Sequence, residues 1–67
     1  MRIDYQKFFI ACAKAQMTMT SAIATAGLSN FLLHRIKQGK NVNALTVGKL
    51  SIVLGVPVES LLELKRG

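Results

Sequence analysis

The stretch from 29 to 40, SNFLLHRIKQGK, carries the side chains of this chain that are best suited to specific binding. If it forms a short helix, several polar residues lie near or on one exposed side, namely Asn30, His34, Arg35, Lys37 and Lys40. The apolar residues Phe31 and Leu32 stand among them. Such a mixture of amide, guanidinium and phenyl groups either binds a specific partner or is a solvated surface with a few stray apolar residues.

Catalysis and metal binding are not expected from the reactive side chains. The chain has one His and one Cys, which falls short of the ligand set of a zinc site, and its three carboxylates lie near the chain ends. It contains no glycine-rich phosphate loop. Cys12 lies on the apolar stripe of a predicted helix, where a free cysteine is usually an inert core residue. We therefore expect no enzyme activity, metal ion, cofactor or small-molecule ligand.

Positive charge dominates the middle of the chain. Nine Lys and Arg residues against three Asp and Glu residues give a net charge of +6, and no acidic residue lies between Asp4 and Glu59. This imbalance favours a polyanionic partner, most simply nucleic acid. An anionic membrane surface, or solubility alone, would favour the same sign of charge.

The length and the cysteine count predict one small intracellular domain. A chain of 67 residues can build one core, so we expect a single domain over residues 1–67. One cysteine cannot form an internal disulfide, and the charged start MRIDYQKFFIACAK does not have the form of a signal peptide. The chain also lacks an uninterrupted apolar stretch of about 18 residues. We expect a cytoplasmic protein with no membrane span.

Capping residues divide the chain into five predicted helices, with almost no strand signal. Ser, Thr, Asn and Asp bind free amides at helix N-termini, and Gly accepts the left-handed conformation past a helix end. The predicted helices, each with its capping or first residue and its end, are Asp4 to about Ala15 or Gln16, Thr18 to Gly27, Ser29 to Gly39, Asn43 to Gly55, and a fifth from Pro57 with Lys65 and Arg66 in its last turn. Leu33 and Ile36 are the predicted inward stripe of the third helix. The predicted fold class is all-α.

The second and third predicted helices are joined by a three-residue turn, Gly27 to Ser29, which is typical of a helix-turn-helix motif. The run from 17 to 62 resembles the phage repressor and Cro type of helix-turn-helix domain, the XRE family of bacterial and phage regulators. The matching positions are Met17-Thr18-Met19, Ala22-Ile23, Gly27-Leu28-Ser29, Leu33-His34, Lys37-Gln38-Gly39, Asn43 with Ala44 and Leu45, and Leu54-Gly55-Val56. The resemblance implies a compact five-helix bundle of the lambda-repressor-like type, with the motif formed by its second and third helices.

The chain departs from the family pattern in the first three predicted helices. Met19 stands where the family commonly has a Gln that holds a DNA phosphate. Cys12 and Lys37 stand where many members pair an Arg with a Glu. Because both partners of that ion pair are replaced together, no partly buried charge is left alone. Lys37 is then free to add positive charge toward a phosphate.

The resemblance implies that the third predicted helix enters the major groove of duplex DNA. The residues that would face the bases are Asn30, Phe31 and Arg35, with His34 beside them. Arg35 suits O6 and N7 of guanine, and Phe31 suits the methyl group of thymine. Phosphate contacts are expected for Thr18, Met19, Ser29, Lys37, Gln38, Lys40, Asn41 and Asn43.

Several of these residues also have purely structural interpretations. Ser29 is a helix cap whatever the protein does. Phe31 would alternatively pack in the core or against a partner, and for Leu32 that placement is preferred to a DNA contact. His34 would alternatively be an ordinary solvated residue.

The C-terminal part holds more apolar residues than one helix face can bury, which we interpret as a two-fold contact between copies. The predicted contact residues are Ile52, Val56, Val58, Leu61 and Leu64. A five-helix core that buries all of them is the alternative.

The favoured function is a sequence-specific, duplex-DNA-binding transcriptional regulator, a small repressor of phage or mobile-element type. It would bind a two-fold operator as a homodimer in the bacterial nucleoid or a phage-infected cell. One alternative is a protein-interaction module, such as an antitoxin-like partner, whose DNA binding is secondary. Another is a cationic membrane-surface protein, against which the short, Gly-capped helices argue.

Overall fold

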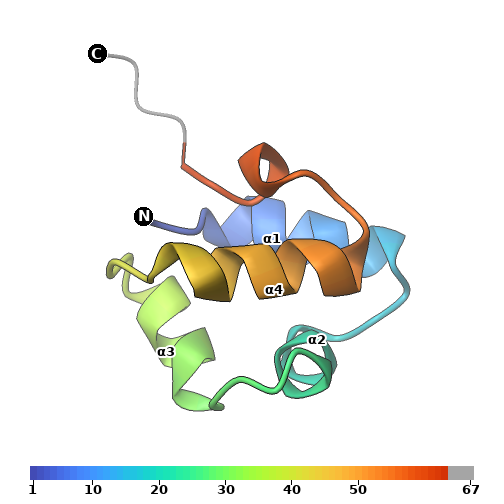
Figure 1. The fold of residues 1–67 in the computed structure, drawn as a ribbon, viewed down its shortest axis with the longest axis horizontal. Coiled ribbons are helices and arrows are strands. Elements are labelled where there is room, and N and C mark those ends of the chain that lie inside the picture. Colours follow the sequence, from blue (N-terminus) through green and yellow to red (C-terminus); the bar gives the residue numbers. More distant parts are fainter. Residues whose placement is uncertain (64–67) are drawn as a thin grey trace.

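The computed structural model describes residues 1–63, which form four α-helices and one 3-10 turn (Figure 1). The elements are α1 (Tyr5–Lys14), α2 (Met19–Thr25), α3 (Phe31–Lys37), α4 (Ala44–Leu54) and η1 (Val58–Ser60). Residues 1–63 contain no strand, and their one isolated bridge joins Ile3 to Leu62. The all-α class is therefore confirmed. No helix of this part of the chain has the length and apolar content needed to cross a membrane.

The predicted caps begin three of the four helices. Their side-chain oxygens accept the backbone N–H three residues later, at 3.1 Å for Asp4, 3.0 Å for Thr18 and 3.0 Å for Asn43. α4 ends at Gly55, whose φ of +67° is in the left-handed region, as predicted. Local capping chemistry thus explains the bounds of α4 and the starts of α1 and α2.

The predicted fifth helix is wrong over the described residues, because residues 58–60 form only the 3-10 turn η1 and residues 61–63 are not helical. Leu62 pairs with Ile3 in an antiparallel bridge, and the backbone N–H of Asp4 donates to the carbonyl oxygen of Leu61 at 2.8 Å. The N-terminal segment therefore occupies backbone groups that a continuing helix would need for its own hydrogen bonds. Three residues with predicted roles in this segment lie outside the described residues, namely Leu64, Lys65 and Arg66.

One small apolar core holds the helices together. Its largest fully buried side chains include Phe8 of α1, Ile23 of α2, Ile36 of α3 and Leu50 of α4. Figure 1 shows α4 crossing the middle of the molecule, with α2 and α3 on one side of it and η1 on the other. Within residues 1–63 no polar or charged side chain is buried, so every polar side chain keeps at least part of its surface exposed.

The inner side of α3 is centred on Leu32 and Ile36. These two residues are buried, and Leu33 is half-buried and packs against the same core. The predicted inward place of Ile36 is therefore confirmed, Leu33 contacts the core without being fully buried, and the preferred placement of Leu32 in the core is confirmed. With Leu32 and Ile36 inside, Phe31 and Arg35 lie on the outer side of the helix.

Candidate nucleic-acid interface

The connection between α2 and α3 is built around a left-handed glycine. Gly27 has a φ of +74°, a conformation that favours glycine over residues with a side chain. The N–H of Leu28 then bonds back to the carbonyl oxygen of Ile23 at 3.0 Å, which closes the end of α2. The connection spans residues 26–30 between the helix bounds, so it is longer than the predicted three-residue turn. The extra residues are the flanking positions of the two helices, Ala26 and Asn30.

Ser29 fixes the start of α3 through its hydroxyl. Its Oγ accepts the backbone N–H of Phe31 at 3.2 Å. Asn30 directly precedes the helix but makes no capping bond with its side chain. Ser29 therefore binds the first amide of α3 through its hydroxyl, although the N-cap position itself is Asn30, and the exposed amide of Asn30 is left available to a partner.

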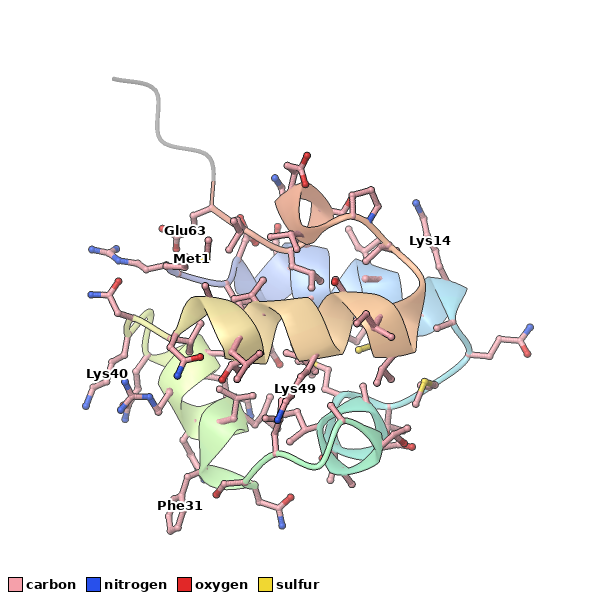
Figure 2. All side chains as sticks on the ribbon, in the orientation of Figure 1. Met1, Lys14, Phe31, Lys40, Lys49 and Glu63 are labelled. Carbon is pink, nitrogen blue, oxygen red and sulfur yellow. The ribbon has the colours of Figure 1, made fainter. Side chains whose placement is uncertain are left out.

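The four predicted base-reading residues all lie on the surface of α3 or just before it. Phe31 is 77% exposed, so the interpretation that it packs in the core is wrong. It stands between two hollows, one of about 350 Å³ that Arg35 also lines and one of about 130 Å³ lined with Asn30 and His34. Figure 2 shows the ring of Phe31 pointing away from the body of the molecule.

Arg35 is held by the connection between α3 and α4. Its Nη2 donates a hydrogen bond of 2.7 Å to the carbonyl oxygen of Asn41. Both residues line the larger hollow, together with Phe31 and Asn43. A guanidinium has several further N–H donors in one plane, so Arg35 can bind a second acceptor while it keeps this bond.

Most predicted phosphate-contact residues surround this hollow or follow it along the chain. Ser29, Asn41 and Asn43 line it, and Lys37, Gln38 and Lys40 are exposed residues at the end of α3 and in the connection that follows. Asn43 uses its Oδ1 to cap α4, which leaves its NH₂ group free to donate. Figure 2 shows Lys40 extending outward from the same end of the molecule as α3.

Thr18 and Met19 lie apart from that group. They line a different, apolar hollow of about 250 Å³ with Phe9 and Met17, between the end of α1 and the start of α2. Thr18 is exposed and its hydroxyl oxygen caps α2, and Met19 is half-buried. The structure therefore does not bring these two predicted residues to the hollow that Phe31 and Arg35 line.

The face formed by α3 and its connection to α4 has no acidic side chain to neutralise its cations. The ion pair recorded within residues 1–63 joins Arg2 to Glu63 at 3.7 Å, near the two ends of the chain. Glu63 borders a separate hollow with Asn41, where it pairs with Arg2, and no Asp or Glu lines the two hollows beside Phe31. Such a surface attracts phosphate groups.

Lys49 is an additional cation of this region, and no role was predicted for it from the sequence. Figure 2 shows it extending from α4 toward the side of the molecule that holds α2 and α3, and it is exposed. Val47, Leu50 and Leu54 are the buried residues of α4. The apolar spacing of this helix was therefore the available signal that Lys49 faces outward.

Cys12 is a core residue rather than part of any site. It is 2% exposed, and desolvation by burial raises the pKa of its thiol. The thiolate, which is the reactive form, is therefore disfavoured. The described part of the chain contains no group of three or more His, Cys, Asp or Glu residues placed to hold a metal ion.

The predicted surface for a second copy is not one exposed patch. Ile52 is 82% exposed, and Val56 and Val58 are half-buried. Leu61 is fully buried in the core, so its predicted place in an interface is wrong. Leu64, the fifth predicted residue, lies outside the described residues.

Comparisons of the chain with protein-family models, with curated proteins and with solved structures find no match.

Proposed function

We propose that the protein is a sequence-specific transcriptional regulator that binds duplex DNA, with α2 and α3 as its helix-turn-helix motif and α3 in the major groove. The observation that carries the proposal is the pair formed by Phe31 and Arg35. Both are exposed on the outer side of α3, and both line one hollow whose lining contains no acidic residue. An α-helix fits the major groove, where each base pair presents a distinct set of donors, acceptors and methyl groups.

Phe31 and Arg35 supply two complementary kinds of contact. A phenyl ring that is 77% exposed gains nothing from the core, but it can cover the methyl group of a thymine. The guanidinium of Arg35 can donate parallel hydrogen bonds to O6 and N7 of a guanine. Asn30 and His34, which border the smaller hollow on the other side of Phe31, extend the face that contacts bases.

The surrounding cations and amides position α3 on the duplex. Lys37, Lys40 and Lys49 contribute charge, and the free NH₂ groups of Asn41 and Asn43 can donate to phosphate oxygens. Contacts of this kind fix the register of a protein on DNA but carry no sequence information. They also make affinity strongly dependent on salt.

The proposed DNA contact is made by a single copy of the chain and does not include a contact between copies. The residues predicted to join two copies do not form one exposed patch. Leu61 is in the core, and Ile52 lies on the outer side of α4. Whether the bound sequence has two-fold symmetry is a separate property, and the experiment below measures it directly.

Selection of bound sequences from a random duplex pool tests the proposal. The expected result is an enriched duplex motif that contains a guanine and a thymine, with affinity that falls steeply as salt is added. The matched variants are Arg35→Ala and Phe31→Ala, which should each remove the preference at their own position. Absence of any enriched motif, or equal binding to duplex and to an unrelated polyanion such as heparin, would contradict the proposal.

A further inference from the structure

The hollow of about 350 Å³ beside Phe31 is apolar on its inner side. The buried residues Leu32 and Val42, which are 8% and 7% exposed, line it together with half-buried Leu28. Figure 2 shows the ring of Phe31 projecting outward from the molecule. Arg35 lines the same hollow and has N–H donors beyond the one that its bond to Asn41 uses. The hollow therefore suits a small apolar group that lies beside hydrogen-bond acceptors.

Duplex DNA presents that combination where a C5-methylated pyrimidine lies next to a guanine. The methyl group on C5 of thymine and the O6 and N7 acceptors of guanine all face the major groove. Phe31 and Arg35 are four residues apart on α3, so their Cβ atoms are about 5–6 Å apart. Successive bases of one strand are separated by about 3.4 Å along the DNA axis. The two side chains can thus reach neighbouring base pairs at the same time.

A phenyl ring detects the methyl group on C5 of a pyrimidine but not the group on C4. Thymine carries a carbonyl oxygen on C4, and cytosine carries an amino group there. Thymine and 5-methylcytosine have the same methyl group on C5. The ring of Phe31 has no hydrogen-bond donor or acceptor, so its contact is equally favourable with either of these two bases.

The polar side chains next to Phe31 also accept either group on C4. Asn30 and His34 line the hollow of about 130 Å³ on the other side of the ring. The amide of Asn30 contains both a donor and an acceptor, and so does a neutral imidazole. Carboxylates accept from the amino group of cytosine, but no Asp or Glu lines either hollow. The methyl group on C5 therefore remains as the feature that this surface can select.

We propose that Phe31 recognises C5-methylated pyrimidines next to the guanine bound by Arg35, so that 5-methylcytosine can replace thymine there and unmethylated cytosine cannot. The inference rests on the proposed function and deepens it, because it names the chemical group that Phe31 contacts. A DNA site with cytosine at this position gains affinity when an enzyme methylates its C5. DNA binding by this chain then responds to cytosine methylation without any change in the protein.

The size and the salt dependence of the effect follow from the chemistry of a methyl group. Burial of one methyl group against Phe31 should strengthen binding by about fourfold. The methyl group carries no charge, so the slope of log affinity against log salt should be the same with and without it. A different slope would mean that methylation changes the phosphate contacts, and it would overturn the proposal.

Parallel selections from two random duplex pools, one with cytosine and one with 5-methylcytosine throughout, provide the first test. The cytosine pool should yield a motif with thymine next to guanine. The 5-methylcytosine pool should yield the same motif, with thymine and 5-methylcytosine both accepted at that position. A motif from the second pool that still excludes 5-methylcytosine would overturn the inference.

Affinities for defined duplexes isolate the contribution of the methyl group. Thymine is compared with uracil, and 5-methylcytosine with cytosine, because each pair keeps the same partner base and differs only by the methyl group. Both affinity ratios should be about fourfold for the parent chain. A 5-methylcytosine placed outside the selected motif should leave the affinity unchanged. Equal affinity for cytosine and 5-methylcytosine within the motif would contradict the proposal.

Variants at two exposed phenylalanines separate recognition of the methyl group from general effects. Phe31→Ala should reduce both ratios to about one, and Phe31→Leu, which keeps an apolar side chain, should give intermediate ratios. Phe9 of α1 is also exposed but lines neither hollow, so Phe9→Ala should keep the ratios of the parent chain. Unchanged ratios in Phe31→Ala would assign the methyl contact to another residue and refute the inference.

The outcomes separate this inference from the proposed function. A selected motif whose guanine preference is lost in Arg35→Ala, together with equal affinity for cytosine and 5-methylcytosine, would refute this inference alone. Absence of a motif from both pools would refute the proposed function and the inference with it. A methyl-dependent ratio that requires Phe31 would support both.

Discussion

Nη2 of Arg35 donates a hydrogen bond of 2.7 Å to the carbonyl oxygen of Asn41, which ties the outer side of α3 to the connection before α4. A long side chain that is held before binding loses less conformational entropy when it meets its partner. The acceptor is a backbone carbonyl, so the fold of the connection fixes where the guanidinium lies. The side chain proposed to bind guanine is thus positioned by a segment outside its own helix.

Replacement of Arg35 should relax sequence preference at one base pair. Arg35→Ala is expected to lose about 1 to 3 kcal/mol of discrimination at the guanine position, because the parallel hydrogen bonds to O6 and N7 are removed. Arg35→Lys should recover part of the affinity but little of the preference, since an ammonium group is not a planar fork. Competition binding among duplexes that differ at each position checks this result. Unchanged preference in Arg35→Ala would assign base recognition to another residue.

Phe31 and Leu32 are neighbours in the chain, but replacing them by Ala should change the free energy of unfolding by very different amounts. Leu32→Ala should lower the free energy of unfolding by about 2 to 5 kcal/mol, because Leu32 is 8% exposed and its loss leaves a cavity. Phe31→Ala should change the free energy of unfolding by less than about 0.5 kcal/mol, because the ring is at the surface. Urea denaturation followed by circular dichroism measures both values.

The same Phe31→Ala variant tests the thymine contact. Replacing the contacted thymine by uracil removes its methyl group and should weaken binding of the parent chain, but it should have no effect on Phe31→Ala. A uracil effect of equal size in both proteins would show that another residue covers the methyl group.

The helix starts could be predicted from sequence because their causes are local. Asp4, Thr18 and Asn43 each bond to an amide three residues away, and Gly55 ends α4 through its own backbone conformation. No knowledge of the rest of the chain is needed to infer such bonds.

The errors arose where distant residues decide the outcome. The segment after η1 has the composition of a helix, but Leu62 pairs with Ile3 from the other end of the chain. In α3, the adjacent apolar residues Leu32 and Leu33 both contact the core, and the packing of α3 decides that Leu32 is the more deeply buried of the two. Periodicity within one helix cannot make that choice.

The exposed residues of the candidate site could be predicted from the sequence, but the hydrogen bond that holds Arg35 could not. The exposed positions of Asn30, His34 and Arg35 agree with the helical pattern of residues 29–40. The bond from Arg35 to Asn41 ends on a carbonyl oxygen, which every residue has, so no residue type signals it. Cys12 was placed in the core from its spacing, and the structure confirms this placement.

Asn43 allows its capping role to be separated from its proposed phosphate contact. Asn43→Ala should destabilise the fold by about 1 kcal/mol, because the amide of Thr46 loses its acceptor. Asn43→Asp should keep the cap and the stability, because a carboxylate is an equally good acceptor at a helix N-terminus. The same carboxylate should weaken duplex binding, since it repels phosphate. Thermal unfolding and duplex affinity measured on both variants check the two effects, and full affinity in Asn43→Asp would place DNA elsewhere.

Lys40 and Lys14 form a matched pair of exposed lysines on different sides of the molecule. Figure 2 shows Lys40 at the end that holds α3, whereas Lys14 extends from the opposite side. Lys40→Ala should weaken binding to all duplex sequences alike and lower the slope of log affinity against log salt by about 1. Lys14→Ala should leave both quantities unchanged. Equal slopes in the two variants would indicate that total charge, rather than its position, controls binding.

Cys12 should make stability depend on pH in the alkaline range. Burial raises the pKa of its thiol, so the folded state holds the thiol proton more tightly than the unfolded chain does. The contribution of this proton to stability is complete below the ordinary thiol pKa of about 8.5, and it is lost as the pH rises through the higher folded-state value. The free energy of unfolding should therefore fall above about pH 8.5. Cys12→Ala should have a lower stability at neutral pH because it loses buried volume, but its pH dependence should lack the part due to the thiol. Denaturant titrations of the parent and of Cys12→Ala between pH 7 and pH 10 isolate this difference, and parallel pH profiles would show that the thiol does not titrate differently in the folded state.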